Sequence, residues 1–229
     1  MLAELRGVFD AVAPNAAREE YAHAIIEANV LGKSTAATRR ATNQRLGELY
    51  GLDRRMPAFR VLRSLWVIDP EARPLLALLV AVFRDPLLAA TASTVVGLRD
   101  GEELTKSPLT SALAAFVGPR MNPATLDKVV RNTASSWAQA GHVAGRTFKR
   151  RQRVKPSPAT VALALYLGWA AGFRGQGLFT NAWVALLDCS PAQAQSLAQE
   201  AKRQGLIDLR IAGDVFEVNV DRLEQLRGV

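Results

Sequence analysis

Apolar residues recur at helical spacing along most of the chain, and prolines and glycines separate the segments. The pattern predicts two helices at residues 15–31 and 35–50, each followed by a glycine. Further helices are predicted at residues 58–68, 74–83 and 86–96. The last two begin with proline, which the first turn of a helix tolerates because its amide hydrogen is not needed there. We therefore expect the first hundred residues to form a helical bundle.

A further helix is predicted over residues 124–140, capped by Asn122 and Pro123 and ended by Gly141. Its apolar side fills one arc of about 100° at 3.6 residues per turn. The members of that arc are Leu126, Val129, Val130, Thr133, Trp137 and Ala140. The opposite arc carries hydrogen-bonding side chains, which are Lys128, Arg131, Asn132, Ser135 and Gln139. One side of this helix should pack on a core while the other stays open to a ligand.

Directly after this helix, residues 142–143 and 147–148 predict two short strands around a turn at Gly145. Six cations lie on this ribbon and just beyond it, within ten positions that hold no acid: Arg146, Lys149, Arg150, Arg151, Arg153 and Lys155. A helix, a glycine and a charged β-ribbon follow one another in this order in a winged helix-turn-helix, with the ribbon as the wing.

The same order recurs nearer the C-terminus, where a capped helix over residues 190–204 follows helices expected at 159–171 and 180–187. Alternating apolar residues on both sides of an Ala212-Gly213-Asp214 turn predict a hairpin. The expected fold is mainly α, with a helical bundle over 1–100, a basic winged-helix-like unit over 101–157 and a second winged-helix-like unit over 158–229.

Composition excludes several classes of protein. Among 229 residues, 49% are hydrophobic and 22% charged, which is not the composition of a disordered, collagen-like or disulfide-stapled chain. The single cysteine, Cys189, cannot form an internal disulfide, and the first residues lack the layout of a secretory signal, so we expect a cytoplasmic protein. The longest uncharged runs are too short or too broken by proline and glycine to span a membrane, which takes ~20 apolar residues.

Charge is concentrated in one part of the chain. The net charge is +8, and residues 101–160 hold 10 basic against 3 acidic side chains, or +7 of the total. Such a cluster is suited to neutralising phosphates, because each cation that contacts one releases condensed counterions. The alternative interpretations are a solvated basic loop and a contact for an acidic protein.

The two features together predict an interface for duplex DNA. A polar helix face fits the major groove, where its side chains can reach base edges, while cations on a wing hold the backbone. We expect Lys128, Arg131, Asn132, Ser135 and Gln139 as readers and the six cations of the ribbon as phosphate contacts. On the predicted helix at 35–50, Arg39 and Arg40 are either a second phosphate contact or part of a solvated face.

The second unit carries less charge. Its helix offers Gln195, Gln199, Lys202 and Arg203, but its hairpin sets Arg210 against Asp208, Asp214 and Glu217, and a wing of this kind repels phosphate. A protein-contact or dimerisation module is an equally good interpretation of this unit, and its residues are not assigned as DNA ligands. The histidines His23 and His142 have no neighbouring partner pattern, and no Cys/His cluster favours a metal, so neither an enzyme nor a cofactor is expected.

Four segments resemble the BrxA family, small proteins encoded in bacterial BREX (bacteriophage exclusion) defence systems. The segments are NVLGKSTAATRRATNQRLGELYGLD (29–53), FRVLRSLW (59–66), RPLLALLVAVFRDPLLAAT (73–91) and SWAQAGHVAGRTFKRRQRV (136–154). The resemblance implies a compact, mainly helical, non-enzymatic DNA-binding protein that works beside other defence components, among them a DNA methyltransferase and an ATPase. The alternatives that remain open are a protein–protein adaptor and an RNA-binding protein.

Overall fold

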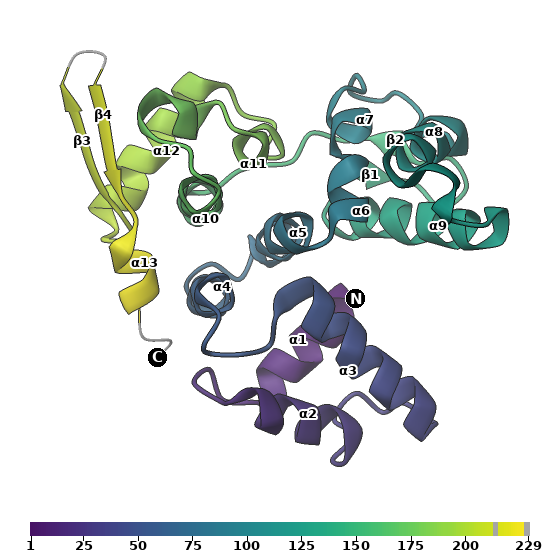
Figure 1. Cartoon of the computed structure of the whole chain (residues 1–229). Coiled ribbons are helices and arrows are strands. Elements are labelled where there is room, and N and C mark those ends of the chain that lie inside the picture. Colours follow the sequence, from purple (N-terminus) through teal and green to yellow (C-terminus); the bar gives the residue numbers. More distant parts are fainter. Residues whose placement is uncertain (213–214, 227–229) are drawn as a thin grey trace.

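The computed structural model describes residues 1–212 and 215–226, and it is mainly helical with two small antiparallel hairpins. Helix α5 (Arg73–Arg84) lies in the middle of the molecule (Figure 1). The N-terminal helices lie on one side of it, and the basic and C-terminal units lie on two others. Every residue from Leu75 to Val82 is buried, because a helix covered on all sides needs apolar residues around its whole circumference.

The N-terminal helices that precede α5 are α1 (Leu2–Ala11), α2 (Arg18–Ile26), α3 (Ala36–Tyr50) and α4 (Pro57–Ile68). The predicted helices at 35–50, 58–68 and 74–83 are confirmed to within a residue at each end. The helix predicted at 15–31 is shorter, since the chain turns at Asn29, whose φ is 49°. Helix α1 was not predicted.

The basic unit contains α6 (Pro86–Ala90), α7 (Ala92–Val96), α8 (Lys106–Val117), η1 (Gly118–Arg120), α9 (Pro123–Gln139), β1 (Val143–Ala144) and β2 (Arg150–Arg151). The helix predicted at 86–96 is interrupted at Thr91, whose hydroxyl donates to the carbonyl of Leu88 at 2.7 Å. Helices α6 and α7 pack on α8, and α6 also packs on α9 and on α5, so residues 86–96 lie between α5 and the predicted basic unit.

Three short segments pair side by side in this unit. Strand β1 is antiparallel to β2, with Ala144 opposite Arg150. Residues 101–104 lie along the other edge of β2, where the amide of Leu104 donates to the carbonyl of Lys149 at 2.7 Å and Glu103 forms a bridge with Arg150. The ribbon is therefore shifted from its prediction: the second strand is 150–151, and residues 147–148 lie in the loop.

The C-terminal unit contains α10 (Pro158–Ala170), η2 (Gly175–Phe179), α11 (Ala182–Ala185), α12 (Pro191–Arg203), β3 (Asp208–Ala212), β4 (Val215–Asn219) and α13 (Asp221–Gln225). The predicted hairpin is confirmed, with Leu209 opposite Val218. Its turn residues Gly213 and Asp214 lie outside the described residues. Only 182–185 of the helix predicted at 180–187 is α-helical.

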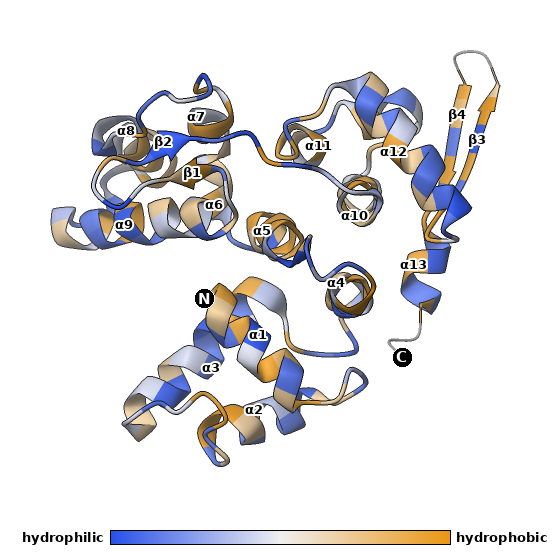
Figure 2. Ribbon diagram, turned by 180° about the vertical axis from the view of Figure 1, so that it is seen from behind, coloured by the Kyte–Doolittle hydropathy of each residue, from blue (hydrophilic) through white to orange (hydrophobic). Residues whose placement is uncertain are grey.

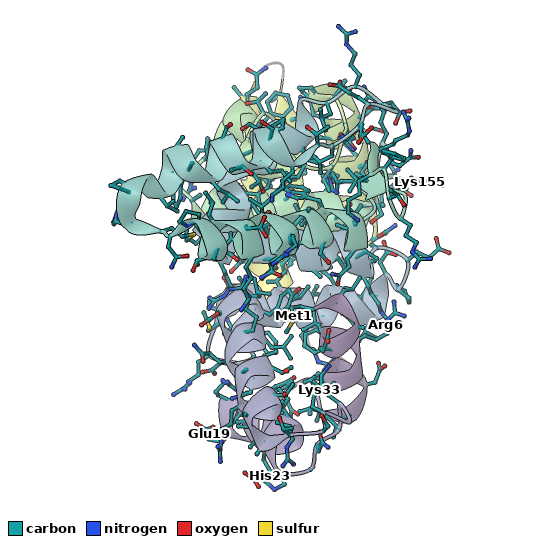
Figure 3. The ribbon with its side chains drawn as sticks, turned by 90° about the vertical axis from the view of Figure 1, so that its right-hand side faces the viewer. Met1, Arg6, Glu19, His23, Lys33 and Lys155 are labelled. Carbon is teal, nitrogen blue, oxygen red and sulfur yellow. The ribbon has the colours of Figure 1, made fainter. Side chains whose placement is uncertain are left out.

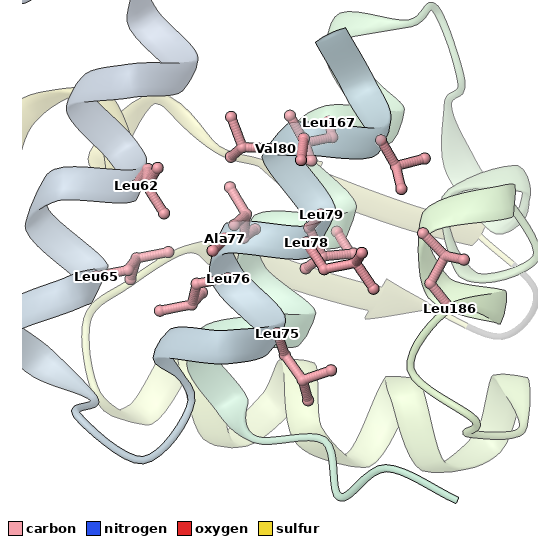
Figure 4. Packing of buried hydrophobic residues seen from close by; sticks show 14 of the residues in the cluster. Leu62, Leu65, Leu75, Leu76, Ala77, Leu78, Leu79, Val80, Leu167 and Leu186 are labelled. Atoms are coloured by element: carbon pink, nitrogen blue, oxygen red, sulfur yellow. The ribbon is translucent and has the colours of Figure 1, made fainter. Parts of the chain in front are cut away.

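One apolar core connects these parts of the chain. Helix α10 packs on α4, α5 and α12, and α13 packs on α4. Figure 4 shows Leu62 and Leu65 of α4 facing the leucines of α5, with Leu167 of α10 beyond them. In the hydropathy colouring of Figure 2, the central helix α5 is largely in the orange of hydrophobic residues. The basic unit is thus held against a core that it shares with the rest of the molecule.

Candidate nucleic-acid interface

Helix α9 begins and ends as the sequence predicts. The Asn122 side chain accepts a hydrogen bond from the amide of Thr125 at 2.8 Å, and Pro123 occupies the first turn. The helix stops before Gly141, whose φ of 88° suits glycine. Such a cap and stop fix the length of the helix and therefore which side chains reach its open face.

The apolar side of α9 packs on α5 and α6, and its anchor is Trp137. This indole is fully buried, and its Nε1 donates to the hydroxyl of Thr91 at 2.9 Å. The ring of His142 stands edge-on to it at 5.1 Å between centroids. Val130 and Thr133 are buried on the same side, so the predicted apolar arc is confirmed. The opposite face of α9 is thereby directed outward.

In the first half of α9, Lys128, Arg131 and Asn132 are exposed as expected. Asp127 is an acid among them. Its carboxylate contacts Lys106 of α8 and lies 3.2 Å from Arg131, and the hydrogen bond from Lys106 lowers the pKa of Asp127. Two cations are therefore partly offset by one carboxylate at the start of the helix.

The second half of α9 is engaged within the molecule. Gln139 Oε1 accepts hydrogen bonds from the backbone nitrogens of Leu2 at 2.9 Å and Met1 at 3.1 Å, and its Nε2 donates to Ser135 at 2.9 Å. Figure 3 shows Met1 close below the helices of the basic unit. Gln139 thus connects α9 to the start of α1 and to Ser135, although both Gln139 and Ser135 are exposed.

Residues 145–149, here called the basic loop, connect β1 to β2. Arg146, Thr147 and Phe148 are exposed and Lys149 is half-exposed. Gly145 has φ of 112°, and a Cβ atom there would lie 2.0 Å from the carbonyl oxygen of Phe148. A larger residue would clash there, so this tight turn requires glycine.

One of the six predicted phosphate contacts is not on the surface. Arg151 is 2% exposed, its Nη2 contacts the carboxylate of Asp188, and its Nη1 donates to the carbonyl of His142. Arg150 is exposed and Arg151 is buried because neighbouring residues of a strand point to opposite sides, and Arg150 takes the outer position on β2. Arg151 is therefore a structural residue, which corrects the sequence-based assignment.

The other cations of the ribbon, together with Lys128 of α9, have no carboxylate partner among the described residues. Among the residues that the structure describes, no carboxylate lies within 4 Å of six cations, which we call the basic surface: Lys128, Arg146, Lys149, Arg150, Arg153 and Lys155. All are exposed except the half-exposed Lys149. Arg150 also donates to the carbonyl of Gly101 at 3.0 Å, which orients its guanidinium without neutralising it. Figure 3 places Lys155 at the outer edge of this unit.

Arg39 and Arg40 lie elsewhere. Both are on α3, which packs on α2 and α5, and Arg40 is exposed while Arg39 is half-buried. In the C-terminal unit, Lys202 donates to the carbonyl of Leu209 at 2.7 Å, and Arg210 faces Glu217 at 3.7 Å. The cations of the basic surface therefore come from the basic unit and the segment directly after it.

Sequence reasoning missed Lys106, Asp188 and the outward position of Phe148. Lys106 was missed because α8 was not predicted, although the Ser107-Pro108 dipeptide in its first turn is a start signal. Asp188 gave no signal, because its role depends on a contact with Arg151, 37 positions earlier in the chain.

The described ranges 1–212 and 215–226 include the titratable side chains His142 and Cys189. No group of three His, Cys, Asp or Glu side chains could hold a metal there. His142 is buried, with Nε2 2.7 Å from the carbonyl of Leu186, and burial lowers its pKa. Burial likewise raises the pKa of Cys189. Over the same residues, no helix has the length and apolar character needed to cross a membrane.

Comparison with known proteins gave no match to a family model, to a curated protein or to a solved structure.

Proposed function

We propose that this protein is a non-enzymatic, double-stranded DNA-binding protein with low sequence specificity. The observation that carries the proposal is the basic surface, whose cations have no carboxylate partner within the described part of the chain. A cluster of exposed cations with nothing to neutralise it is costly by self-repulsion, and a polyphosphate removes that cost while it releases counterions.

The arrangement of elements supports duplex DNA as the polyphosphate. Helices α6 and α7, the segment 101–104, α8, α9, β1 and β2 follow one another in the order of a winged helix, with β2 between its two neighbours. In helix-turn-helix proteins the N-terminal residues of the second helix reach base edges in the major groove. This fits α9, where Lys128 and Asn132 are open while Gln139 is engaged.

Low specificity follows from the type of side chain. Most members of the basic surface are on the loop, β2 and the segment after it, where they would meet phosphates. Phosphate contacts set the position of a protein on the duplex but carry no sequence information. Only a few side chains of α9 remain for base edges, so a preference for one sequence would be small.

A place in anti-phage defence rests on the resemblance to the BrxA family. The proposed role is that of a BREX-like component which binds DNA beside a methyltransferase and an ATPase. Co-purification of the chain with the products of neighbouring defence genes tests this role. If the chain binds DNA but co-purifies with none of these proteins, the DNA-binding proposal stands and the proposed role in defence is refuted.

The test of DNA binding is a series of binding isotherms on a random-sequence duplex from low to physiological salt. The logarithm of affinity should fall linearly with the logarithm of salt concentration, by ~0.9 per phosphate contact. The double variant Arg146→Ala/Lys149→Ala should reduce that slope by roughly 1.8. The charge-matched control Arg6→Ala/Arg203→Ala removes two exposed cations outside the basic unit and should leave the salt slope unchanged. Equal salt slopes for both variants would refute the proposal. Competition with single-stranded DNA and with RNA tests whether the protein prefers duplex DNA.

A further inference from the structure

The basic loop exposes a large apolar side chain among its cations. Phe148 is 62% exposed, the most exposed phenylalanine in the described part of the chain. No described aromatic ring stacks on it, unlike Phe179, whose ring lies 5.4 Å from Phe216. An aromatic ring held in water at a loop tip gains free energy once a partner covers it.

The loop presents this ring between two paired backbone segments. A Cβ atom at Gly145 would clash with the carbonyl of Phe148, so the turn requires glycine. Ala144 pairs with Arg150, and the amide of Leu104 donates to the carbonyl of Lys149 from the other edge. Backbone pairing thus holds the loop at Ala144 on one side and at Lys149 and Arg150 on the other. A side chain on a pre-ordered loop loses less entropy on binding than one on a mobile segment.

The neighbours of the ring identify the kind of surface that it fits. Arg146 and Lys149 flank Phe148, and neither has a carboxylate partner among the described residues. The DNA minor groove combines a strongly negative potential, which attracts arginine, with base steps that accept apolar wedges such as phenylalanine. A purely apolar protein pocket would leave both flanking cations desolvated and unpaired, which is unfavourable.

We propose that Phe148 enters the minor groove next to the major groove that α9 occupies, where its ring wedges against a base step and bends the duplex while Arg146 and Lys149 hold the flanking phosphates. This inference rests on the proposed function and deepens it, since it assigns the basic loop to a groove and gives the apolar contact a role distinct from charge neutralisation.

The experiment compares Phe148→Ala with Phe173→Ala on a duplex of 25 base pairs that carries a fluorescence donor and acceptor at its ends. Phe173 is the matched control, since it is 41% exposed but lies in the C-terminal unit. Wild-type protein should shorten the end-to-end distance, because minor-groove wedges kink the duplex by ~20–90°. Phe148→Ala should abolish the shortening and weaken binding about tenfold while the salt slope stays the same. Phe173→Ala should behave as wild type.

The outcomes separate this inference from the proposed function. If wild-type protein fails to bind the duplex, the proposed function falls and this inference with it. If the wild type binds with a steep salt slope but Phe148→Ala retains wild-type affinity and bending, only the wedge is refuted. If Phe148→Ala weakens binding to single strands and not to the duplex, the ring stacks on unpaired bases and the minor-groove assignment is overturned. Equal thermal melting midpoints of the variants exclude misfolding as the cause.

Discussion

Arg151 and Asp188 form a buried ion pair that joins β2 of the basic unit to the segment between α11 and α12. Their side chains are 2% and 5% exposed. The second carboxylate oxygen of Asp188 accepts a hydrogen bond from the amide of Val154 at 2.9 Å, so the same group holds the chain where it leaves the ribbon. An arginine from the most basic stretch of the sequence therefore fixes the orientation of that stretch and takes no part in its surface.

Asp188→Asn is expected to lower the free energy of unfolding by ~3–5 kcal/mol, because it leaves the guanidinium of Arg151 buried without its counter-charge. Asparagine tolerates the positive φ of 53° at this position, so backbone strain does not confuse the result. Urea denaturation measures the change. Arg153→Ala, an exposed neighbour, should shift stability by less than about 0.5 kcal/mol. Indistinguishable unfolding curves for the two variants would show that the pair contributes no stability.

Gly145→Ala should weaken duplex binding because the basic loop can no longer close. The new Cβ would meet the carbonyl of Phe148 at 2.0 Å, and the φ of 112° is itself unfavourable for alanine. We expect a loss of stability of about 1–3 kcal/mol together with reduced affinity. Gly172→Ala is the control: its φ is 96°, but the added Cβ has open space around it. A loss of affinity in Gly172→Ala as large as that in Gly145→Ala would contradict the role of the loop.

Stability should fall as the pH drops below about 6.5, and His142 is the reason. Burial lowers the pKa of this imidazole in the folded chain. The hydrogen bond with the carbonyl of Leu186 and the negative charge of Asp188 raise the pKa, but burial is the larger effect. The unfolded chain therefore binds the proton first, and up to about 1.4 kcal/mol is lost per pH unit until the folded form also titrates. Urea unfolding at pH 7.5 and 5.5 should show this loss in the wild type and in His23→Gln, but much less in His142→Gln. An unaltered pH dependence in His142→Gln would assign the loss to other groups.

Alanine substitution of two polar residues of α9 should have opposite effects, one on stability and the other on DNA affinity. Gln139→Ala should lower stability by ~1 kcal/mol, since the backbone nitrogen of Leu2 loses its acceptor, and should leave DNA affinity unchanged. Asn132→Ala should leave stability unchanged and weaken duplex binding roughly two- to tenfold, as expected for one lost hydrogen bond. Thermal melts and binding isotherms on the same samples provide both readings. The reverse assignment of effects would place the interface at the other end of the helix.

The sequence predicted the parts of the fold that depend on local signals. Caps such as Asn122, stops such as Gly141 and the apolar arc of α9 gave that helix its bounds and its buried side. The register of the ribbon was misplaced because residues 101–104, which pair with β2, lie far away in the chain. The burial of Arg151 was missed for a similar reason, since an arginine in a basic run looks exposed until Asp188 is placed beside it.

The all-round burial of α5 limits how this protein can be divided. A fragment of residues 1–100 would expose to solvent the leucines of α5 that pack on α10. A fragment that lacks α5 would expose the side of α10 that packs on α5. Bare apolar stripes of this kind promote aggregation. The basic unit consequently should not be studied as an isolated fragment: grafts and truncations should keep helix α5, and assays are best performed on the intact chain.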